Sequence, residues 1–255
     1  MANSVKSAEE IELMRESSRI VGDVIKLVKS QIKPGVTTIQ LDRLAEDYIR
    51  SCGAIPAFKG YGSEPDNLFP GTLCVSVDNE VVHGIPGNRV LREGEIVSID
   101  VGAKKNGFFG DGAFTFPVGE VSADKQRLMR VTKESLDRAV EKAVDGNKIG
   151  DIAYAVQSFV EAEGFSVVRD LVGHAIGREL HEDPQVPNYG KPNKGVVLRS
   201  GMTLAIEPMV NFGTYKVRTL ADRWTIVTED GSPSAHYEYT VVVGAHKAEV
   251  LTIYN

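Results

Sequence analysis

Four acidic side chains interrupt or end apolar runs in this 255-residue sequence. Asp100 interrupts the run EIVSIDVG, and Asp111 follows among glycines and aromatic residues in GFFGDGAF. Glu207 ends a third run in GMTLAIEP, and Glu238 lies inside a fourth in AHYEYTVVVG. Burying a carboxylate is costly unless something neutralises it. Hard oxygen ligands suit divalent cations, and four carboxylates balance two of them. The pattern therefore predicts a two-metal site, which activates a shared water and clamps the reacting oxygens.

A predicted hairpin places the two aspartates on one face of a sheet. A turn at Lys105-Asn106 would put Asp111 directly opposite Asp100. A turn at Asn106-Gly107, the commoner hairpin pair, would put Asp111 one pair along, diagonal to Asp100. Both registers leave the two side chains on the same face, because side chains alternate with period two. Taken alone, Asp111 could equally be a solvated loop residue, and the three other acids favour the metal site.

Histidines supply further candidates. His174 and His181 are seven residues apart in VGHAIGRELHEDPQVP, where glycine and proline favour strand and loop over helix. His83 ends an apolar run in NEVVHGIPG. A lone histidine there is more often structural, but the acids expected nearby favour a place in the site. His236, two residues from an acid, is expected to support the site, and His246 is expected to be solvated.

Periodic apolar residues predict the elements that must position these groups. Ser7 and Glu10 have capping-box spacing and begin a helix that Pro34-Gly35 breaks. A second helix follows and closes at Gly53. We expect further helices over about 123–144 and 150–163, and strands at Leu73–Val77, through the hairpin, at Met202–Ile206 and at Tyr237–Val243.

A repeat runs through the chain. Shifted by 107 residues, VLREGEIVSID (Val90–Asp100) matches VLRSGMTLAIE (Val197–Glu207) at five of eleven positions, and both stretches end in a carboxylate. Shifted by 111 residues, the second helix lies over the fourth. Two amphipathic helices can match by chance, but two matches at nearly one offset favour a duplication. We therefore expect a single domain over residues 1–255, with halves of roughly 1–121 and 122–255 that share one core.

Composition excludes several classes of protein. The chain is 42% hydrophobic and 25% charged, as in ordinary globular enzymes. It has no apolar run long enough for a membrane span, and MANSVKSAEE lacks the features of a signal peptide. Cys52 and Cys74 have no metal-type spacing and fit a reducing cytoplasm. A net charge of -6 without a basic cluster makes nucleic acid and acidic membranes poor candidates for a main partner. A cytoplasmic location is expected.

Five motifs in order resemble type I methionine aminopeptidases over nearly the whole chain. They are NEVVHGIP, SIDVG…GFFGDGAFTFPVG, VGHAIGRELHEDPQVPNYG, GMTLAIEPMVNFG and DRWTIVTEDGSPSAHYEYTVVV. The resemblance implies the α+β pita-bread fold, in which two pseudo-symmetric halves of antiparallel sheet are covered by helices and hold a dinuclear site between them. It implies removal of the N-terminal methionine from nascent polypeptides whose second residue is small. A monomer acting near the ribosome exit is expected.

The resemblance also implies a role for each candidate residue. Two divalent ions, of cobalt, manganese, iron or zinc, would be held by Asp100, Asp111, His174, Glu207 and Glu238. Glu207 would be the base that takes the proton from the attacking water, while His181 would contact the substrate carbonyl and His83 the scissile amide. Cys74, Leu180 and Trp224 would line the methionine pocket, although Trp224 could instead be a core aromatic.

Some positions depart from the family pattern, and two other functions remain open. Phe109, Leu180 and Tyr239 stand where many members have other residues, and they are expected at or around the pocket wall. A Xaa-Pro peptidase would share the fold and ligands but would usually carry Thr-Arg-Thr after the second aspartate, where Asp111 is followed here by GAFTF. A non-catalytic binding protein on this fold would have lost ligands, and this sequence keeps all five.

Overall fold

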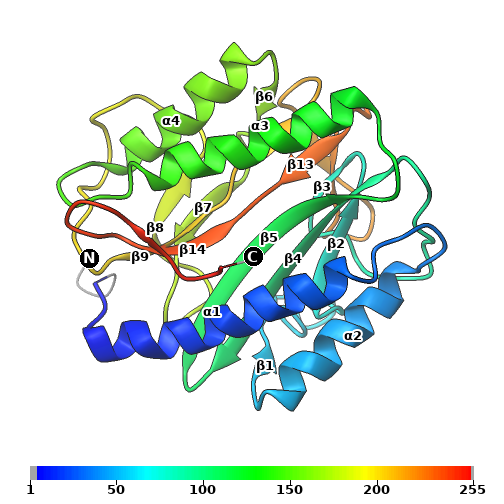
Figure 1. Ribbon diagram of the computed structural model, residues 1–255, viewed down its shortest axis with the longest axis horizontal. Coiled ribbons are helices and arrows are strands. Elements are labelled where there is room, and N and C mark those ends of the chain that lie inside the picture. The colour runs from blue at the N-terminus through cyan, green and yellow to red at the C-terminus, as the bar shows by residue number, and fades with distance from the viewer. Residues whose placement is uncertain (1–4, 254–255) are drawn as a thin grey trace.

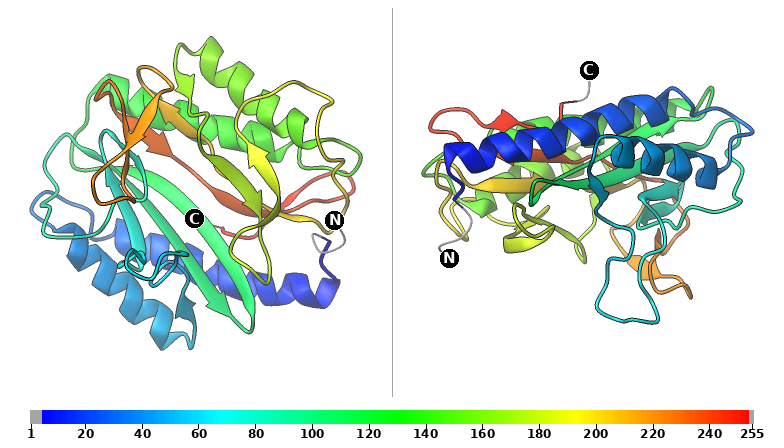
Figure 2. Two further views of the ribbon diagram at one scale, coloured as in Figure 1. Left: turned by 180° about the vertical axis from the view of Figure 1, so that it is seen from behind. Right: turned by 90° about the horizontal axis from the view of Figure 1, so that it is seen from below.

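The structure, a computed structural model, describes residues 5–253. Helices cover one side of a layer of antiparallel sheets, and loops project from the other side (Figure 1; Figure 2). The helices are α1 (Ala8–Lys29), α2 (Thr38–Ser51), α3 (Ala123–Val140) and α4 (Ile149–Ala162). The strands are β1 (Ile55–Pro56), β2 (Leu73–Val77), β3 (Glu80–Val82), β4 (Ile96–Lys105), β5 (Phe108–Pro117), β6 (Ser166–Val167), β7 (Val172–Ala175), β8 (Glu182–Pro187), β9 (Thr203–Ile206), β10 (Met209–Asn211), β11 (Val217–Thr219), β12 (Ile226–Thr228), β13 (Ser234–His236), β14 (Tyr239–Val242) and β15 (Glu249–Val250).

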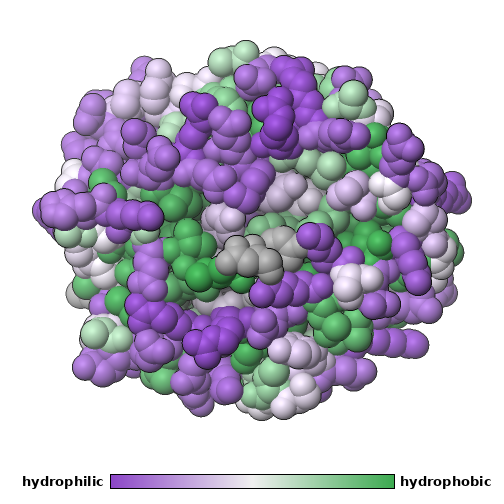
Figure 3. All heavy atoms as spheres, in the orientation of Figure 1, coloured by the Kyte–Doolittle hydropathy of each residue, from purple (hydrophilic) through white to green (hydrophobic). Residues whose placement is uncertain are grey.

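The first helix begins where its capping box predicts. The Ser7 hydroxyl accepts from the Glu10 backbone N–H at 3.2 Å, and the Glu10 carboxylate accepts from the Ser7 N–H at 2.9 Å. These bonds satisfy N–H groups that lack a partner within the helix. The apolar stripe of α1 packs on β4 and β5 and contributes Val21 and Val24 to the main core. Figure 3 shows that hydrophilic side chains predominate on the outward surfaces of α1, α3 and α4.

The β4–β5 hairpin has the second of the two predicted registers. Asp100 pairs with Ala113, and Gly102 pairs with Asp111, so the two aspartates are diagonal neighbours. The turn is at Asn106-Gly107, and both residues have positive φ, 51° and 85°. Asparagine and glycine tolerate that conformation best, which explains why the turn forms there. The register with directly opposed aspartates is therefore wrong.

The strand predicted over Tyr237–Val243 is shorter in the structure, as β14 over Tyr239–Val242, and a separate strand, β13, precedes it. β13 pairs with β10, whereas β14 pairs with β9 in a different sheet. Glu238 lies at the crossing, where its backbone N–H donates to Ala113 O of β5 at 2.8 Å. Glu207 lies at the matching crossing between β9 and β10, followed by Pro208, which has no N–H to donate. Both glutamates therefore come from points where the chain changes sheet.

The third helix also ends earlier than the sequence predicts. α3 stops at Val140, because the chain beyond it turns to pair with the C-terminal segment. Val144 forms a bridge with Gly244, and the Asp145 N–H donates to Gly244 O at 2.9 Å. α4 agrees with its predicted range within a residue at each end. Within residues 5–253, no helix has both the length and the apolar character needed to cross a bilayer.

Equivalent backbone contacts recur at the offsets found in the sequence. Thr37 pairs with Val90, and Lys148 pairs with Val197. Likewise β1 pairs with β4, and β6 pairs with β10, at corresponding residues. Two related halves of roughly 1–121 and 122–255 remain a proposal, which now rests on contacts as well as on sequence.

Candidate metal centre

A cavity of ≈ 120 Å³ is lined by every residue proposed from the sequence as a metal ligand, substrate contact or part of the methionine pocket. A larger open groove of ≈ 630 Å³ beside α3 and α4 holds none of them. Three aromatic residues also line the small cavity and were missed, because they come from the irregular, glycine- and proline-rich stretch before β2. The complete lining is Phe58, Tyr61, Phe69, Cys74, His83, Asp100, Asp111, His174, Leu180, His181, Glu207, Trp224 and Glu238.

Three side chains at the floor of the cavity have metal-ligand spacing. Ligand atoms of Asp111, His174 and Glu238 all lie within 4.8 Å of one another. Asp111 comes from β5, His174 from β7, and Glu238 from the crossing between β13 and β14. Asp100, from β4, and Glu207 line the same floor, and Glu207 Oε1 lies 3.6 Å from His174 Nε2. Strands from two different sheets, and two crossings where the chain changes sheet, thus converge on one small volume.

Asp100, Asp111 and Glu238 are buried together, and the part-buried Glu207 lies beside them. Among residues 5–253 no ion pair joins any of the four to lysine or arginine. Burial raises the pKa of Asp100 to about 7 and that of Glu207 to about 8. Burial first, and then the neighbouring carboxylates, raise the pKa values of Asp111 and Glu238 well above the usual range. Ionising this cluster at neutral pH therefore requires a positive charge within it.

The residues present fit divalent cations. Within the described chain, Asp100 Oδ1 and Glu238 Oε1 are buried without a hydrogen-bond partner. Nδ1 of His174 lies 3.0 Å from Ala175 O, and a carbonyl can only accept, so the ring proton is on Nδ1. Nε2 then presents its lone pair toward the carboxylates, as a metal-binding histidine does. Burial lowers the pKa of His174 to about 3, which keeps the ring neutral.

His236 lies beside Glu207 at the edge of the floor. Its Nε2 lies 3.5 Å from Glu207 Oε2, and the ring is 1% exposed. Thr115 fixes the backbone of His236 by accepting from its N–H at 2.9 Å and donating to its carbonyl at 2.8 Å. The supporting place expected for His236 therefore falls beside Glu207. His246 is exposed, as predicted.

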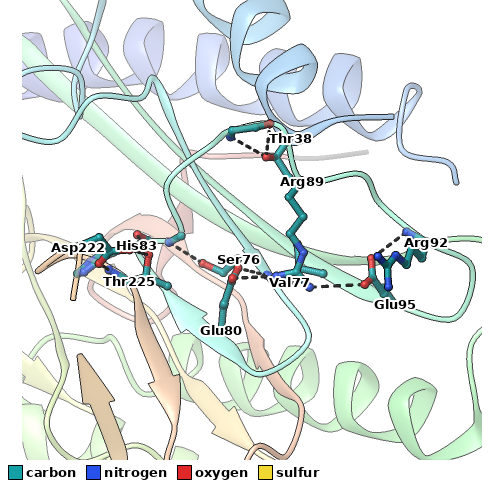
Figure 4. Close-up of polar contacts among 12 residues, drawn as sticks. Thr38, Ser76, Val77, Glu80, His83, Arg89, Arg92, Glu95, Asp222 and Thr225 are labelled. Atoms are coloured by element: carbon teal, nitrogen blue, oxygen red, sulfur yellow. Dashed lines mark hydrogen bonds and ion pairs between the residues drawn. The ribbon is translucent and has the colours of Figure 1, made fainter. Parts of the chain in front are cut away.

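His83 is held at one side of the cavity by a strained turn. Its φ is 59°, in the left-handed region that residues with a Cβ rarely adopt. Figure 4 shows the polar contacts that fix this turn. The Gly84 N–H donates to Ser76 Oγ at 3.1 Å. Thr225 Oγ1 donates to Asp222 Oδ2 at 2.7 Å and lies 3.4 Å from His83 O. Burial lowers the pKa of His83 to about 4, so the ring is neutral near pH 7.

His181 lies at the exposed mouth of the cavity on the turn between β7 and β8. One carboxylate organises this turn: Glu182 Oε1 accepts from the N–H groups of Arg178 and Glu179 at 2.8 and 3.2 Å. Glu182 Oε2 lies 2.7 Å from Nζ of Lys6, whose side chain is 3% exposed. The N-terminal segment thus braces the turn that carries His181. The rings of His174 and His181 are 4.3 Å apart, so the turn also contacts the floor.

The remaining wall is apolar. Cys74 and Leu180 are buried on it, and Trp224 packs edge-on against Phe69 at 5.3 Å. The Trp224 indole N–H donates to Asn67 O at 3.1 Å, which fixes the ring at the wall. Trp224 is therefore a cavity residue and not solely a core aromatic.

Two of the three departures from the family pattern do not reach this cavity. Phe109 packs below the wall, with Lys104 Nζ 4.6 Å from its ring centre. Tyr239 contacts Phe114 and Lys133 on the helix side of the sheet. The expectation of a place at or around the pocket wall holds for Leu180, which lines the cavity, and for Phe109, which packs with the wall residues behind it. It does not hold for Tyr239.

Comparison with known proteins gives consistent matches. Residues 12–245 match the family model for metallopeptidase family M24. A methionine aminopeptidase of Clostridium acetobutylicum is 53% identical over 250 residues, 98% of each chain. The crystal structure of a Thermotoga maritima methionine aminopeptidase has a TM-score of 0.94 and 46% identity, covering 97% of this chain and 98% of that one.

A more distant structure shares the fold alone. A prolidase from Pyrococcus furiosus has a TM-score of 0.78 at 22% identity, covering 99% of this chain and 66% of that one. The pita-bread fold expected from the sequence is therefore confirmed. The chain belongs to metallopeptidase family M24 and, within it, to the methionine aminopeptidases.

Proposed function

We propose that this protein removes the N-terminal methionine from polypeptides whose second residue is small, by hydrolysing the first peptide bond. The observation that carries this proposal is one cavity with a floor of buried carboxylates, two histidines at its edge and an apolar wall. The floor suits metal-assisted hydrolysis, and the wall suits an apolar side chain. The relatives named methionine aminopeptidase support the same assignment.

We propose that Asp100, Asp111, His174, Glu207 and Glu238 hold two divalent cations. Their carboxylate and imidazole donors are compatible with manganese, iron, cobalt or zinc. When bound, such ions activate water at neutral pH and neutralise charge on the reacting oxygens. The supporting observations are the 4.8 Å cluster, the buried oxygens without partners and the absence of ion pairs to lysine or arginine among the described residues.

The protein's own residues then move protons and fix the substrate. Glu207, which lies on the floor beside His174, accepts the proton of the attacking water and delivers it to the leaving amine. His181 donates a hydrogen bond to the carbonyl oxygen as that atom gains charge. His83, neutral near pH 7, contacts the scissile amide from the opposite side of the cavity.

Side-chain selection follows from the wall and the floor. Cys74, Leu180 and Trp224, with Phe58 and Phe69, offer an apolar surface for the first side chain. Methionine is unbranched and polarizable, so it adapts to such a wall. The second residue must be small, because the scissile bond has to approach a floor enclosed by buried strands. Gly, Ala, Ser, Thr, Cys, Pro and Val fit this requirement, and bulky or charged residues do not.

Peptide hydrolysis with added manganese tests the proposal. Met-Ala-Ser should release methionine, Met-Lys-Ser should be a poor substrate, and Leu-Ala-Ser should be spared. Equal kcat/KM for the first two would refute the steric argument, and comparable release of leucine would refute the pocket assignment. Cleavage of Ala-Pro in preference to Met-Ala-Ser would favour the Xaa-Pro alternative instead.

We also propose that the protein acts in the cytoplasm as a monomer, on nascent chains near the ribosome exit. Its two cysteines are free, which fits a reducing compartment. One chain supplies all ten residues proposed for the site, which is compatible with a monomer. Co-sedimentation with translating ribosomes and size-exclusion chromatography test these two points.

A further inference from the structure

A tyrosine outside the ligand set contacts His181 directly. The Tyr61 hydroxyl lies 2.5 Å from His181 Nδ1, and the two ring centres are 5.2 Å apart. Tyr61 comes from the loop between β1 and β2, one of the segments that project from the side opposite the helices (Figure 2), whereas His181 lies between β7 and β8. The contact therefore joins parts of the chain 120 residues apart.

Hydrogen bonds within the loop fix the backbone of Tyr61. The Tyr61 N–H donates to Phe58 O at 2.9 Å, and Tyr61 O accepts from the Phe69 N–H at 2.8 Å. The Gly60 N–H also donates to Phe69 O at 2.8 Å, which closes the base of the loop. These bonds hold the tyrosine at the junction of the cavity and the outer groove, both of which it lines.

The chemistry of the two groups sets the direction of the bond. A phenol, with an ordinary pKa of about 10, keeps its proton near neutral pH. It is a better donor than a neutral imidazole N–H, and an unprotonated imidazole nitrogen is a better acceptor than a phenol oxygen. The favoured arrangement is therefore Tyr61 O–H donating to His181 Nδ1. The proton of the neutral ring must then sit on Nε2, since the bond at one nitrogen determines the state of the other.

We infer that Tyr61 is a positioning residue, which holds His181 in the tautomer that has its N–H donor on Nε2. This inference rests on the proposed function, in which His181 donates to the carbonyl oxygen of the scissile bond. The opposite tautomer would present a lone pair to that oxygen as it becomes negative, and would repel it. Tyr61 thus acts through His181, and its hydroxyl makes the histidine a donor before substrate arrives.

Tyr61→Phe removes the hydroxyl and keeps the ring, so it isolates this role. In the zinc-loaded protein, ¹⁵N NMR of the histidine rings should show His181 protonated on Nε2 in the parent and a mixture of tautomers in the variant. The His181→Ala variant assigns the signals. With Met-Ala-Ser, Tyr61→Phe should lower kcat by roughly 2- to 10-fold, the net worth of one hydrogen bond, while KM stays within about twofold.

A double-mutant cycle separates positioning from lining. Tyr61→Phe should cause no further loss in the His181→Ala background, because its effect passes through that ring. Tyr48→Phe, which removes a hydroxyl bonded to Asp23 away from the cavity, is the matched control and should leave kcat unchanged. Equal losses in both backgrounds, or unchanged His181 ring shifts, would overturn the inference. The NMR result can be read even if Met-Ala-Ser is not hydrolysed. Failure of the proposed function can therefore be distinguished from failure of the inference about Tyr61.

Discussion

The floor of the cavity (Asp100, Asp111, His174, Glu207 and Glu238) and its rim (His83 and His181) are built in different ways. Asp100, Asp111 and His174 belong to paired strands and are at most 9% exposed. His83 and His181 belong to turns, and His181 is exposed at the mouth. Strands hold charged groups at fixed spacing against their repulsion, which a cation site needs. Turns leave side chains accessible to a substrate that must enter and leave.

Substitution at the floor should have the largest effect. Asp111→Asn keeps the shape of the side chain but removes the charge and half of its acceptor capacity. Loss of a partner outside the ligands typically costs 10–100-fold in metal affinity or activity, so loss of a ligand should cost at least ~10³-fold. Turnover of Met-Ala-Ser and bound manganese, measured by elemental analysis, should both collapse, and Glu238→Gln should behave alike.

The folded state must survive for this result to be informative. Each variant replaces a buried carboxyl whose pKa is raised by burial and crowding with a neutral amide, so the metal-free variants should melt no lower than the metal-free parent. Full activity in either purified variant would contradict the assignment of the floor as the metal site.

Substitution at the rim should separate chemistry from metal binding. His181→Ala should lower kcat by ~10²–10³-fold, as expected for losing one donor to a developing oxyanion. Metal content should stay near that of the parent, because His181 is not one of the five proposed ligands and its Nδ1 is bonded to the Tyr61 hydroxyl. His174→Ala is the matched comparison and should lose metal. If instead His181→Ala released the metal while substrate still bound, the roles of the two histidines would be exchanged.

Substitution of Glu182, which holds the turn that carries His181, should have a smaller effect on kcat. Glu182→Ala removes the acceptor for two backbone N–H groups and the partner of Lys6 Nζ. The turn that carries His181 should loosen, and kcat should fall roughly 2- to 10-fold, equivalent to about one hydrogen bond. Glu179→Ala, at an exposed neighbour on the same turn, should change little. Equal kcat in the two variants would show that the turn keeps its shape without the Glu182 carboxylate.

The floor could be predicted from the sequence far better than the rim. Asp100 and Glu207 end apolar runs that match at one offset, and that pattern is local and periodic. Even there, the sequence did not show that Glu238 lies between two strands, since the change of sheet depends on pairing with distant β5 and β10. Hydrophobic periodicity cannot predict where a strand ends when pairing with distant strands determines the course of the chain.

The rim depends on contacts between distant residues. Tyr61 lies in a loop without periodic pattern, and its bond to His181 joins loops from opposite parts of the chain. Lys6 and Glu182 are 176 residues apart, so no local sequence pattern could predict their ion pair. The family resemblance supplied His83 and His181 as residues beside the substrate, but it did not supply what holds them in place.

The last contrast between floor and rim concerns stability without metal. Unfolded Asp and Glu have pKa values near 4, whereas those of Asp100 and Glu207 are about 7 and about 8 in the folded chain. Between these values the folded state binds more protons than the unfolded state, so the free energy of unfolding falls as pH rises. Chelated protein should therefore lose Tm steadily from about pH 5 to about pH 8, by about 2–4 °C for each kcal/mol.

Added cations should reverse this trend, because they favour the ionised carboxylates that burial opposes. With excess manganese, Tm at pH 8 should rise more than Tm at pH 5, as differential scanning calorimetry can measure. Asp111→Asn removes one of the crowded acids and should flatten the decline in the chelated chain, whereas Glu179→Ala at the exposed rim should leave its slope unchanged. A chelated parent whose Tm is constant or rises over this range would mean that the floor carboxylates are not held in mutual repulsion, and the physical argument for a cation among them would fail.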